Sequence, residues 1–209
     1  MMKIYDISLP LDVRTIIYPG NPEMLIESHQ SVPEHPTNLS KITFGSHTGT
    51  HVDAPRHIDN NAIGVDKVSL EACIGLCRVL DMTKVEEKIS IFDLEKENIK
   101  KGERILVKTK NSLRGFREFY EDYIYLDGDA ADFLCNAGIV LFGIDALSVK
   151  KRGGEDVRPH TSLLSKIIVI FEGLDLSGVE PGEYNFIGLP LRFVDLDGAP
   201  ARALIVKND

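Results

Sequence analysis

The sequence contains no apolar run long enough to cross a membrane. A helix that spans a bilayer needs about 18 or more apolar residues in succession, whereas one of the longest runs here covers only residues 167–171. The first residues, 1–6, also lack the apolar core of a signal peptide. We therefore expect no membrane partner.

Cysteine is scarce. The chain has 3 cysteines, Cys73, Cys77 and Cys135, which is an odd number in a protein long enough to fold without disulfides. Cys73 and Cys77 do not have the C-x-x-C spacing of zinc ribbons and redox motifs. We interpret all three as small, buried apolar side chains of a reduced protein, which predicts a cytoplasmic location.

Basic residues are outnumbered by acidic ones. The 24 Lys and Arg oppose 32 Asp and Glu, so the formal net charge is −8. Nucleic-acid binding depends on clustered cations, and the compact basic runs at 100–101 and 150–152 are expected to be solvated loops. We therefore expect no nucleic-acid partner. The composition, 43% hydrophobic and 27% charged, is that of a globular protein, and 209 residues fit one domain over 1–209.

Strand and helix patterns alternate along the chain. The continuous apolar runs 139–142 and 167–171 predict strands that are covered on both faces. Further extended segments are expected at 3–9, 24–28, 39–44, 77–82, 104–109, 191–194 and 201–206, and helical ones at 69–73, 91–98, 129–136 and 161–166. The pattern predicts an α/β protein with many more strands than a simple doubly wound sheet, closed by a hairpin of 191–194 with 201–206.

The segment 45–64 is rich in turn-forming residues and is expected to be largely loop. Within it, His47, His51 and His57 surround Asp53. Imidazole and carboxylate groups are the usual ligands of zinc, manganese and ferrous iron. Since isolated histidines are usually surface residues, His29 and His35, which lie in separate polar or proline-rich stretches, are assigned no role.

The spacing of these histidines predicts a bent backbone. On a straight strand His47 and His51 would lie about 13 Å apart, at about 3.3 Å per residue, which is too far for one metal ion. The glycines, Pro55 and the β-branched residues of the segment oppose a helix. The remaining solution is a loop that folds back at Gly49, where glycine allows a sharp bend.

A second feature is Arg158-Pro159-His160, which precedes a short helix and a strand ending at Glu172. Strand ends are where α/β proteins open their crevices, although a solvated strand end and a histidine at a helix start are the alternative interpretations. The glycine-containing stretch 151–156 before His160 is either a lid or a plain mobile loop.

Residues 47–57 resemble the HxGTHxDxPxH motif of the cyclase-like metal-dependent hydrolases, a family that includes bacterial kynurenine formamidase (arylformamidase) and isatin hydrolase. The resemblance covers nearly the whole chain, in the order 6–9, 18–20, 143–146, 160–173, 189–191 and 197–202. It implies a swivelling β/β/α fold in a single, strand-rich domain with short helices. It also implies a homo-oligomer, a dimer or a tetramer.

The resemblance also assigns roles to residues. It implies one or two zinc or manganese ions bound by His47, His51, Asp53, His160 and Glu172, with Asp53 shared between two ions, and it implies that His57 donates and accepts protons. Tyr18 stands where kynurenine formamidases carry a tryptophan that packs on the substrate, whereas this chain has no Trp. A buried structural tyrosine is the alternative interpretation.

The implied activity is hydrolysis of an amide C–N bond of a small-molecule substrate. Hydroxide generated at the metal attacks the carbonyl, and His57 passes a proton to the leaving nitrogen. Cyclic amides and lactones suit the same groups. Two other classes remain open: a ferrous oxygenase that uses His51, Asp53 and His160 as a facial triad, and a metal-binding domain without catalysis.

Overall fold

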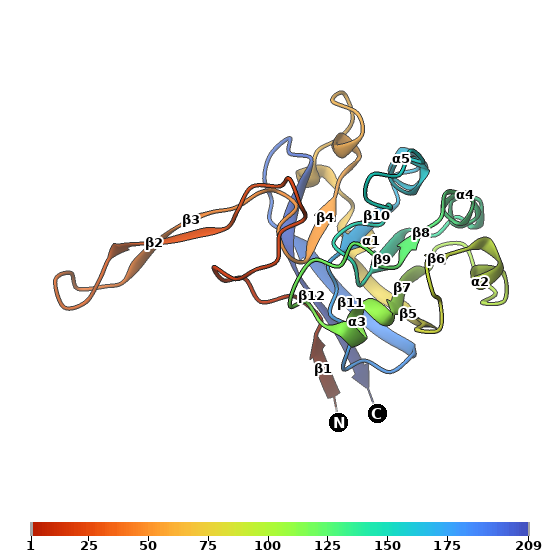
Figure 1. The fold of residues 1–209 in the computed structure, drawn as a ribbon, viewed down its shortest axis with the longest axis horizontal. Coiled ribbons are helices and arrows are strands. Elements are labelled where there is room, and N and C mark those ends of the chain that lie inside the picture. The colour runs from red at the N-terminus through yellow and green to blue at the C-terminus, as the bar shows by residue number, and fades with distance from the viewer. Residues whose placement is uncertain (1, 209) are drawn as a thin grey trace.

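The computed structural model describes residues 2–208 and contains an eight-stranded mixed sheet that closes on itself (Figure 1). The strands follow the order β1 (Met2–Asp6), β12 (Gly198–Asn208), β11 (Gly182–Pro190), β5 (Ile74–Met82), β7 (Arg104–Thr109), β9 (Leu141–Ile144), β10 (Val169–Glu172) and β4 (His51–Asp53). The short strand β4 pairs with both β10 and β12 and thereby closes the sheet into a barrel-like ring. The pairs β5–β7, β7–β9 and β9–β10 are parallel, and the other pairs of this sheet are antiparallel.

Short helices join the strands. They are α1 (Leu70–Cys73), α2 (Ile91–Glu95), α3 (Lys110–Arg114), α4 (Gly128–Ala137) and α5 (Arg158–Ser165), with the 3₁₀ turns η1 (Pro55–His57) and η2 (Val65–Lys67). A small pairing of β6 (Lys88–Ile89) with β8 (Tyr125–Leu126) lies outside the main sheet. No helix within residues 2–208 is long and apolar enough to cross a bilayer.

Local sequence signals explain the helix ends. The Ser69 hydroxyl accepts a hydrogen bond from Ala72 N at 3.2 Å and so caps α1. Gly138 ends α4 with a left-handed φ of +74°, which a residue with a side chain rarely adopts.

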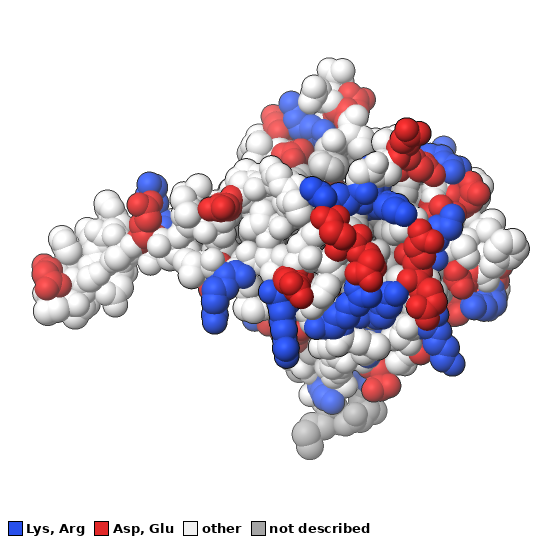
Figure 2. Space-filling model, viewed as in Figure 1, with Lys and Arg blue, Asp and Glu red and all other residues white. Residues whose placement is uncertain are grey.

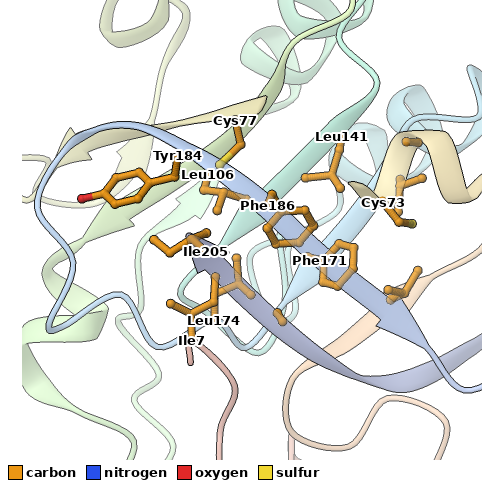
Figure 3. Close-up of a cluster of buried hydrophobic side chains, with 14 of the residues drawn as sticks. Ile7, Cys73, Cys77, Leu106, Leu141, Phe171, Leu174, Tyr184, Phe186 and Ile205 are labelled. Atoms are coloured by element: carbon orange, nitrogen blue, oxygen red, sulfur yellow. The ribbon is translucent and has the colours of Figure 1, made fainter. Parts of the chain in front are cut away.

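The core lies on both faces of the parallel strands. Along β10, Val169 and Phe171 pack into one cluster, where Phe171 makes an edge-to-face contact with Phe186 at a distance of 5.1 Å between ring centroids (Figure 3). Ile170 points to the opposite face, where the second cluster includes Leu163 of α5. Burial on both faces is the physical reason for the unbroken apolar run along this strand.

Strands β2 (Leu25–Gln30) and β3 (Leu39–Thr43) form a separate antiparallel hairpin, which extends away from the body of the molecule (Figure 1). We call this hairpin the arm. Its strands are exposed along almost their whole length. The histidines that received no role, His29 and His35, lie in the arm and are also exposed.

The strand-rich α/β prediction is confirmed, and three local predictions are wrong. Residues 191–194 are not a strand, because the strand that pairs with β12 is β11. One of the buried positions of β11 is Gly188, which has no apolar side chain to mark the alternation in the sequence. Ile167 is exposed with φ +58°, so β10 starts only at Val169. Cys135 is half-buried, whereas Cys73 and Cys77 are buried as expected.

The bounds of other segments shift. The helix expected at 91–98 ends at Glu95, and α5 begins at Arg158 rather than at 161. The segment 45–64 is loop apart from β4 and the turn η1.

Candidate metal centre

Two antiparallel strands bring the buried carboxylates of the site together. Glu172, the last residue of β10, is the register partner of His51 on β4, and Asp53 follows on the same side of β4 two residues later. His51 Nε2 lies 3.1 Å from Glu172 Oε2 and 3.5 Å from Asp53 Oδ1. All three residues are at most 3% exposed.

The loop before β4 bends where the sequence predicts it. Gly49 has φ +62°, and a side chain there would lie 2.4 Å from Leu11 Cδ2. The Gly49 carbonyl accepts the Nδ1–H of His51 at 2.9 Å, so the other nitrogen of His51, Nε2, faces the carboxylates. Upstream of the bend, His47 Nδ1 lies 2.8 Å from Asp53 Oδ1.

Helix α5 supplies the third histidine of the cluster, His160. His160 Nε2 lies 3.2 Å from Glu172 Oε1 and 3.5 Å from Asp53 Oδ2. Both carboxylates therefore face histidines that come from separate parts of the chain.

His57 stands at the solvent side of this cluster, on the turn η1. Its ring lies 4.3 Å from that of His47 and 5.3 Å from that of His160, centroid to centroid. Its side chain is 33% exposed, against 1% for His51. His57 is thus the histidine of the group that an incoming molecule could reach most easily.

Polar atoms without hydrogen bonds indicate what the cluster could hold. Among the residues that the structure describes, His51 Nε2 and Asp53 Oδ2 are buried atoms that make no hydrogen bond, since the 3.1 Å contact of His51 Nε2 with Glu172 Oε2 lacks hydrogen-bond geometry. Burial of such atoms costs free energy unless something compensates it. Two groups have ligand atoms within 4.8 Å of one another: His51, Asp53 and Glu172, and His47, Asp53 and His57. These nitrogen and carboxylate donors fit a divalent metal ion.

The charges of the cluster shift its pKa values in opposite directions. Burial opposes ionisation of Asp53, but the adjacent His47 and His160 hold the pKa of this carboxyl well below its usual value. Burial also lowers the pKa of His47 and His160, yet the neighbouring carboxylates outweigh it and raise these pKa values to about 9 and about 10. These histidines share their protons with the carboxylates, an arrangement that a divalent cation can replace.

His57 differs from its neighbours. Burial lowers its pKa below 6.5, and the positive charges of His47 and His160 lower it further against the pull of Asp53. A neutral imidazole at neutral pH can accept a proton.

Asp197 also belongs to this cluster, although no local sequence pattern assigns it a role. Its Oδ2 lies 2.6 Å from His47 Nε2 and 3.9 Å from His57 Nδ1. The available signal was its position in the segment 197–202, which resembles the end of the family pattern.

Tyr18 lies in an aromatic group beside the cluster. Its ring packs edge-to-face on Phe119 at 5.3 Å, and Phe119 packs on Tyr123 at 5.7 Å. Burial raises the pKa of Tyr18, and the negative charge of Glu172 contributes to the rise. The charge of Glu172 therefore acts on Tyr18, which is only partly buried.

Comparisons with known proteins agree with this geometry. A family model described as putative cyclase matches residues 5–151. Kynurenine formamidase of Bacillus thuringiensis subsp. konkukian (strain 97-27) is 36% identical over 201 residues, which cover 96% of this chain and 95% of that protein. A solved structure described as a potential metal-dependent hydrolase with cyclase activity is 33% identical, with a TM-score of 0.89 and complete coverage of both chains.

A more distant structure shares the fold. It is an isatin hydrolase bound to the product analogue thioisatinate, 19% identical with a TM-score of 0.86, and the match covers 100% of this chain and 93% of that one. The family model spans more than half of the chain, and the formamidase relative spans nearly all of it. The chain therefore belongs to the putative cyclase family of metal-dependent hydrolases.

Proposed function

We propose that this protein hydrolyses the amide C–N bond of a formamide carried on an aromatic amine, as an arylformamidase. The chain is an amidohydrolase, as its full-length similarity to kynurenine formamidases supports. The observation that carries the proposal is the buried group of His51, Asp53 and Glu172, whose ligand atoms converge beside a neutral, accessible His57.

The proposed cofactor is zinc or manganese, as one or two ions for each chain. His47, His51, Asp53, His160 and Glu172 would hold it, with Asp53 placed between the two groups of donors. When bound, a divalent ion polarises the substrate carbonyl and increases the acidity of water. A facial triad of an oxygenase would need only three protein ligands, which leaves His47 and Glu172 without a role.

His57 is proposed to move the proton. Its lowered pKa keeps the ring neutral at pH 7, so it can take a proton from water during attack. The protonated ring then donates to the leaving nitrogen, which is necessary because an amide anion is a very poor leaving group. Its exposure on the solvent side of the cluster gives His57 access to both the attacking water and the leaving nitrogen.

Tyr18 is proposed to bind the aryl part of the substrate. It belongs to the aromatic group with Phe119 and Tyr123, and the negative charge of Glu172 acts on its hydroxyl and contributes to its raised pKa. Aromatic rings pack favourably on one another, with about 0.5–1.5 kcal/mol for each pair beyond the area they bury. This contact replaces the tryptophan of the kynurenine formamidases, which the chain lacks.

The test is hydrolysis of N-formylkynurenine by purified protein that has been stripped of metal and then loaded with zinc or with manganese. We expect turnover that depends on the ion and disappears with a chelator. A matched panel contains isatin, an N-formyl aliphatic amine and a lactone. Turnover of isatin or the lactone in preference to the formamides would overturn the substrate assignment. Metal binding without hydrolysis of any compound would overturn the enzymatic proposal.

We also propose that the protein is a homo-oligomer, a dimer or a tetramer. The arm exposes Leu25, Leu39 and Ile42 by 50% or more, and Figure 2 shows few charged side chains along it. A two-stranded hairpin is marginally stable without further packing, so a second copy of this chain is the proposed cover. Light scattering of the wild type and of a Leu39→Glu/Ile42→Glu variant tests this, because an unchanged mass in the variant would exclude the arm as the interface.

Two further proposals concern the whole chain. Residues 1–209 form one domain, which the shared sheet between the two core clusters supports. The cytoplasm is the proposed location, supported by the free thiols of Cys73, Cys77 and Cys135. Limited proteolysis and fractionation of cells test these two points.

A further inference from the structure

We infer that Asp197 is a positioning residue, which orients the His47 ring toward the proposed metal site and places a negative charge beside His57. The inference rests on the proposed metal centre and assigns a role to a residue outside the proposed ligand set. The inference depends on one oxygen of this carboxylate. Asp197 Oδ2 lies 2.6 Å from His47 Nε2 and accepts a hydrogen bond from the Ser46 hydroxyl at 3.0 Å.

The fold fixes this carboxylate relative to the site. Asp197 directly precedes β12, whose first residue, Gly198, is the register partner of Asp53. The backbone carbonyl of Asp197 accepts the N–H of Ala54 at 2.9 Å. The main chain of Asp197 is therefore tied to the end of β4, the strand that carries His51 and Asp53.

The glycine that follows makes room for the histidine ring. A Cβ atom at Gly198 would lie 2.9 Å from His47 Cε1 and 2.7 Å from Val52 O. Distances below 3.0 Å would force one of these groups to move. Asp197 and Gly198 thus act on the same ring, since one binds its Nε2 and the other leaves the space that its Cε1 occupies.

The contact determines which nitrogen of His47 can bind a metal. With Nε2–H donated to Asp197, the nitrogen that faces Asp53, at 2.8 Å, is Nδ1. His51 shows the opposite arrangement, because its Nδ1–H is donated to the Gly49 carbonyl and its Nε2 faces the carboxylates. Carboxylates that bind the outer nitrogen of a ligating histidine fix its tautomer and increase its basicity as a ligand.

The same oxygen also acts on His57. Asp197 Oδ2 lies 3.9 Å from His57 Nδ1, and the rings of His47 and His57 are 4.3 Å apart. A fixed negative charge at this place stabilises the imidazolium that forms when His57 accepts a proton, as a carboxylate behind a histidine base does in other hydrolases. Asp197 acts through the two histidines and not on the substrate.

The first measurement is the histidine tautomer, by two-bond ¹H–¹⁵N correlation of zinc-loaded protein labelled with [¹⁵N]histidine. The His47 signals are assigned with a His47→Gln variant. We expect wild-type His47 to carry its proton on Nε2, and Asp197→Ala to change the Nε2–H signal. A proton on Nδ1 of His47 in the wild type would overturn the inference.

The second measurement is zinc affinity, by competition with a chromogenic chelator. Loss of an outer partner of a ligand typically costs about 10–100-fold in metal affinity, which is the loss that we expect for Asp197→Ala. Asp197→Asn keeps an acceptor oxygen but no charge, so its affinity should lie between those of Asp197→Ala and the wild type. Asp195→Asn, which changes an exposed carboxylate two residues earlier in the same loop, is the matched control and should leave affinity unchanged.

These measurements need no substrate, so they separate this inference from the proposed function. Equal zinc affinity in the wild type, Asp197→Ala and Asp197→Asn would overturn the inference whether or not formamides are hydrolysed. If Asp197→Ala does not fold, the Asp197→Asn variant and the wild-type tautomer decide the question. Absence of formamide turnover together with the expected tautomer and affinities would overturn the proposed substrate and leave the role of Asp197 at the metal centre supported.

Discussion

His51 and Glu172 are register partners on β4 and β10, and their side chains meet with His51 Nε2 3.1 Å from Glu172 Oε2. The same carboxylate accepts the backbone N–H of Val149 at 2.6 Å and also faces His160. The pairing of two strands that are remote in sequence therefore assembles one side of the proposed metal centre.

The first prediction concerns the charge of Glu172. We expect Glu172→Gln to lose metal affinity by more than the about 10–100-fold typical of an outer partner, because the variant keeps the shape and one acceptor oxygen but not the anionic ligand. Metal content after dialysis and chelator competition measure this. Glu183→Gln, on the exposed side of β11, is the control, and equal metal content in the two variants would remove Glu172 from the ligand set.

The composition of the site was more predictable than its geometry. The histidines around Asp53 are close in sequence, and the bend at Gly49 follows from metal–ligand distances together with the residues that oppose a helix. The contact of Asp197 with His47 joins residues 150 positions apart through the pairing of β12 with β4. Such a contact depends on strand register, which local patterns do not specify.

The fold shows the same division between local and remote information. Strand β7 and helix α4 follow local patterns: β7 covers the predicted 104–109, and α4 covers 128–137 where the sequence predicts 129–136. The sequence did not predict strand β11, because Gly182 and Gly188 weaken its hydrophobic pattern. Gly188 is nevertheless required there, since a Cβ atom at this position would lie within 2.6 Å of the rings of Phe186 and Phe171. Closure of the ring by β4 involves only three residues on each strand, too few for a sequence pattern to indicate.

The second prediction separates metal binding from proton transfer. We expect His57→Ala to keep its metal and to lose turnover by about 10²–10⁴-fold, the usual contribution of a general acid–base group. Asp53→Ala should lose both metal and turnover, since Asp53 faces His47, His51 and His160. Metal analysis and rates on the same preparations test this, and undiminished activity of His57→Ala would remove His57 from the mechanism.

The third prediction concerns pH and the metal-free protein. In the folded state the pKa values of His47 and His160 are raised to about 9 and about 10 from the ordinary 6.5. Folding therefore retains protons that the unfolded chain releases above pH 6.5. The resulting stabilisation is fully present below pH 6.5 and is lost as pH rises toward 9–10.

Urea unfolding in the presence of a chelator, between pH 6.5 and 8.5, measures this effect. The free energy of unfolding should fall by up to about 1.4 kcal/mol per pH unit for each retained proton. The slope should be smaller in His160→Gln, which removes one of the two groups. A flat profile in the wild type, or the same slope in the variant, would contradict the raised pKa values.

The fourth prediction compares two glycines with similar φ angles. Gly173 has φ +68° and Gly153 has φ +69°, but a Cβ at Gly173 would lie 2.5 Å from Gly49 O, whereas nothing lies within 4 Å at Gly153. Gly153→Ala should therefore lower the free energy of unfolding by only about 1–2 kcal/mol, the cost of a side chain on a residue in the left-handed conformation. Gly173→Ala should cost more and reduce metal affinity, because it displaces the bend before His51. If urea unfolding gave the same loss of free energy for both variants, the close approach of Gly173 to the Gly49 carbonyl would not restrict the side chain at position 173.

The fifth prediction concerns recognition of the aryl group. Removal of the Tyr18 ring in Tyr18→Ala should raise KM for an aromatic formamide by about 2- to 12-fold, which corresponds to the about 0.5–1.5 kcal/mol of one aromatic contact, and should leave kcat nearly unchanged. Tyr18→Trp should retain the wild-type KM or lower it. Steady-state kinetics with an N-formyl aliphatic amine provide the control, because that substrate has no ring to pack on Tyr18. If Tyr18→Ala weakened both substrates equally, Tyr18 would support the site through its packing on Phe119 and not through contact with the substrate.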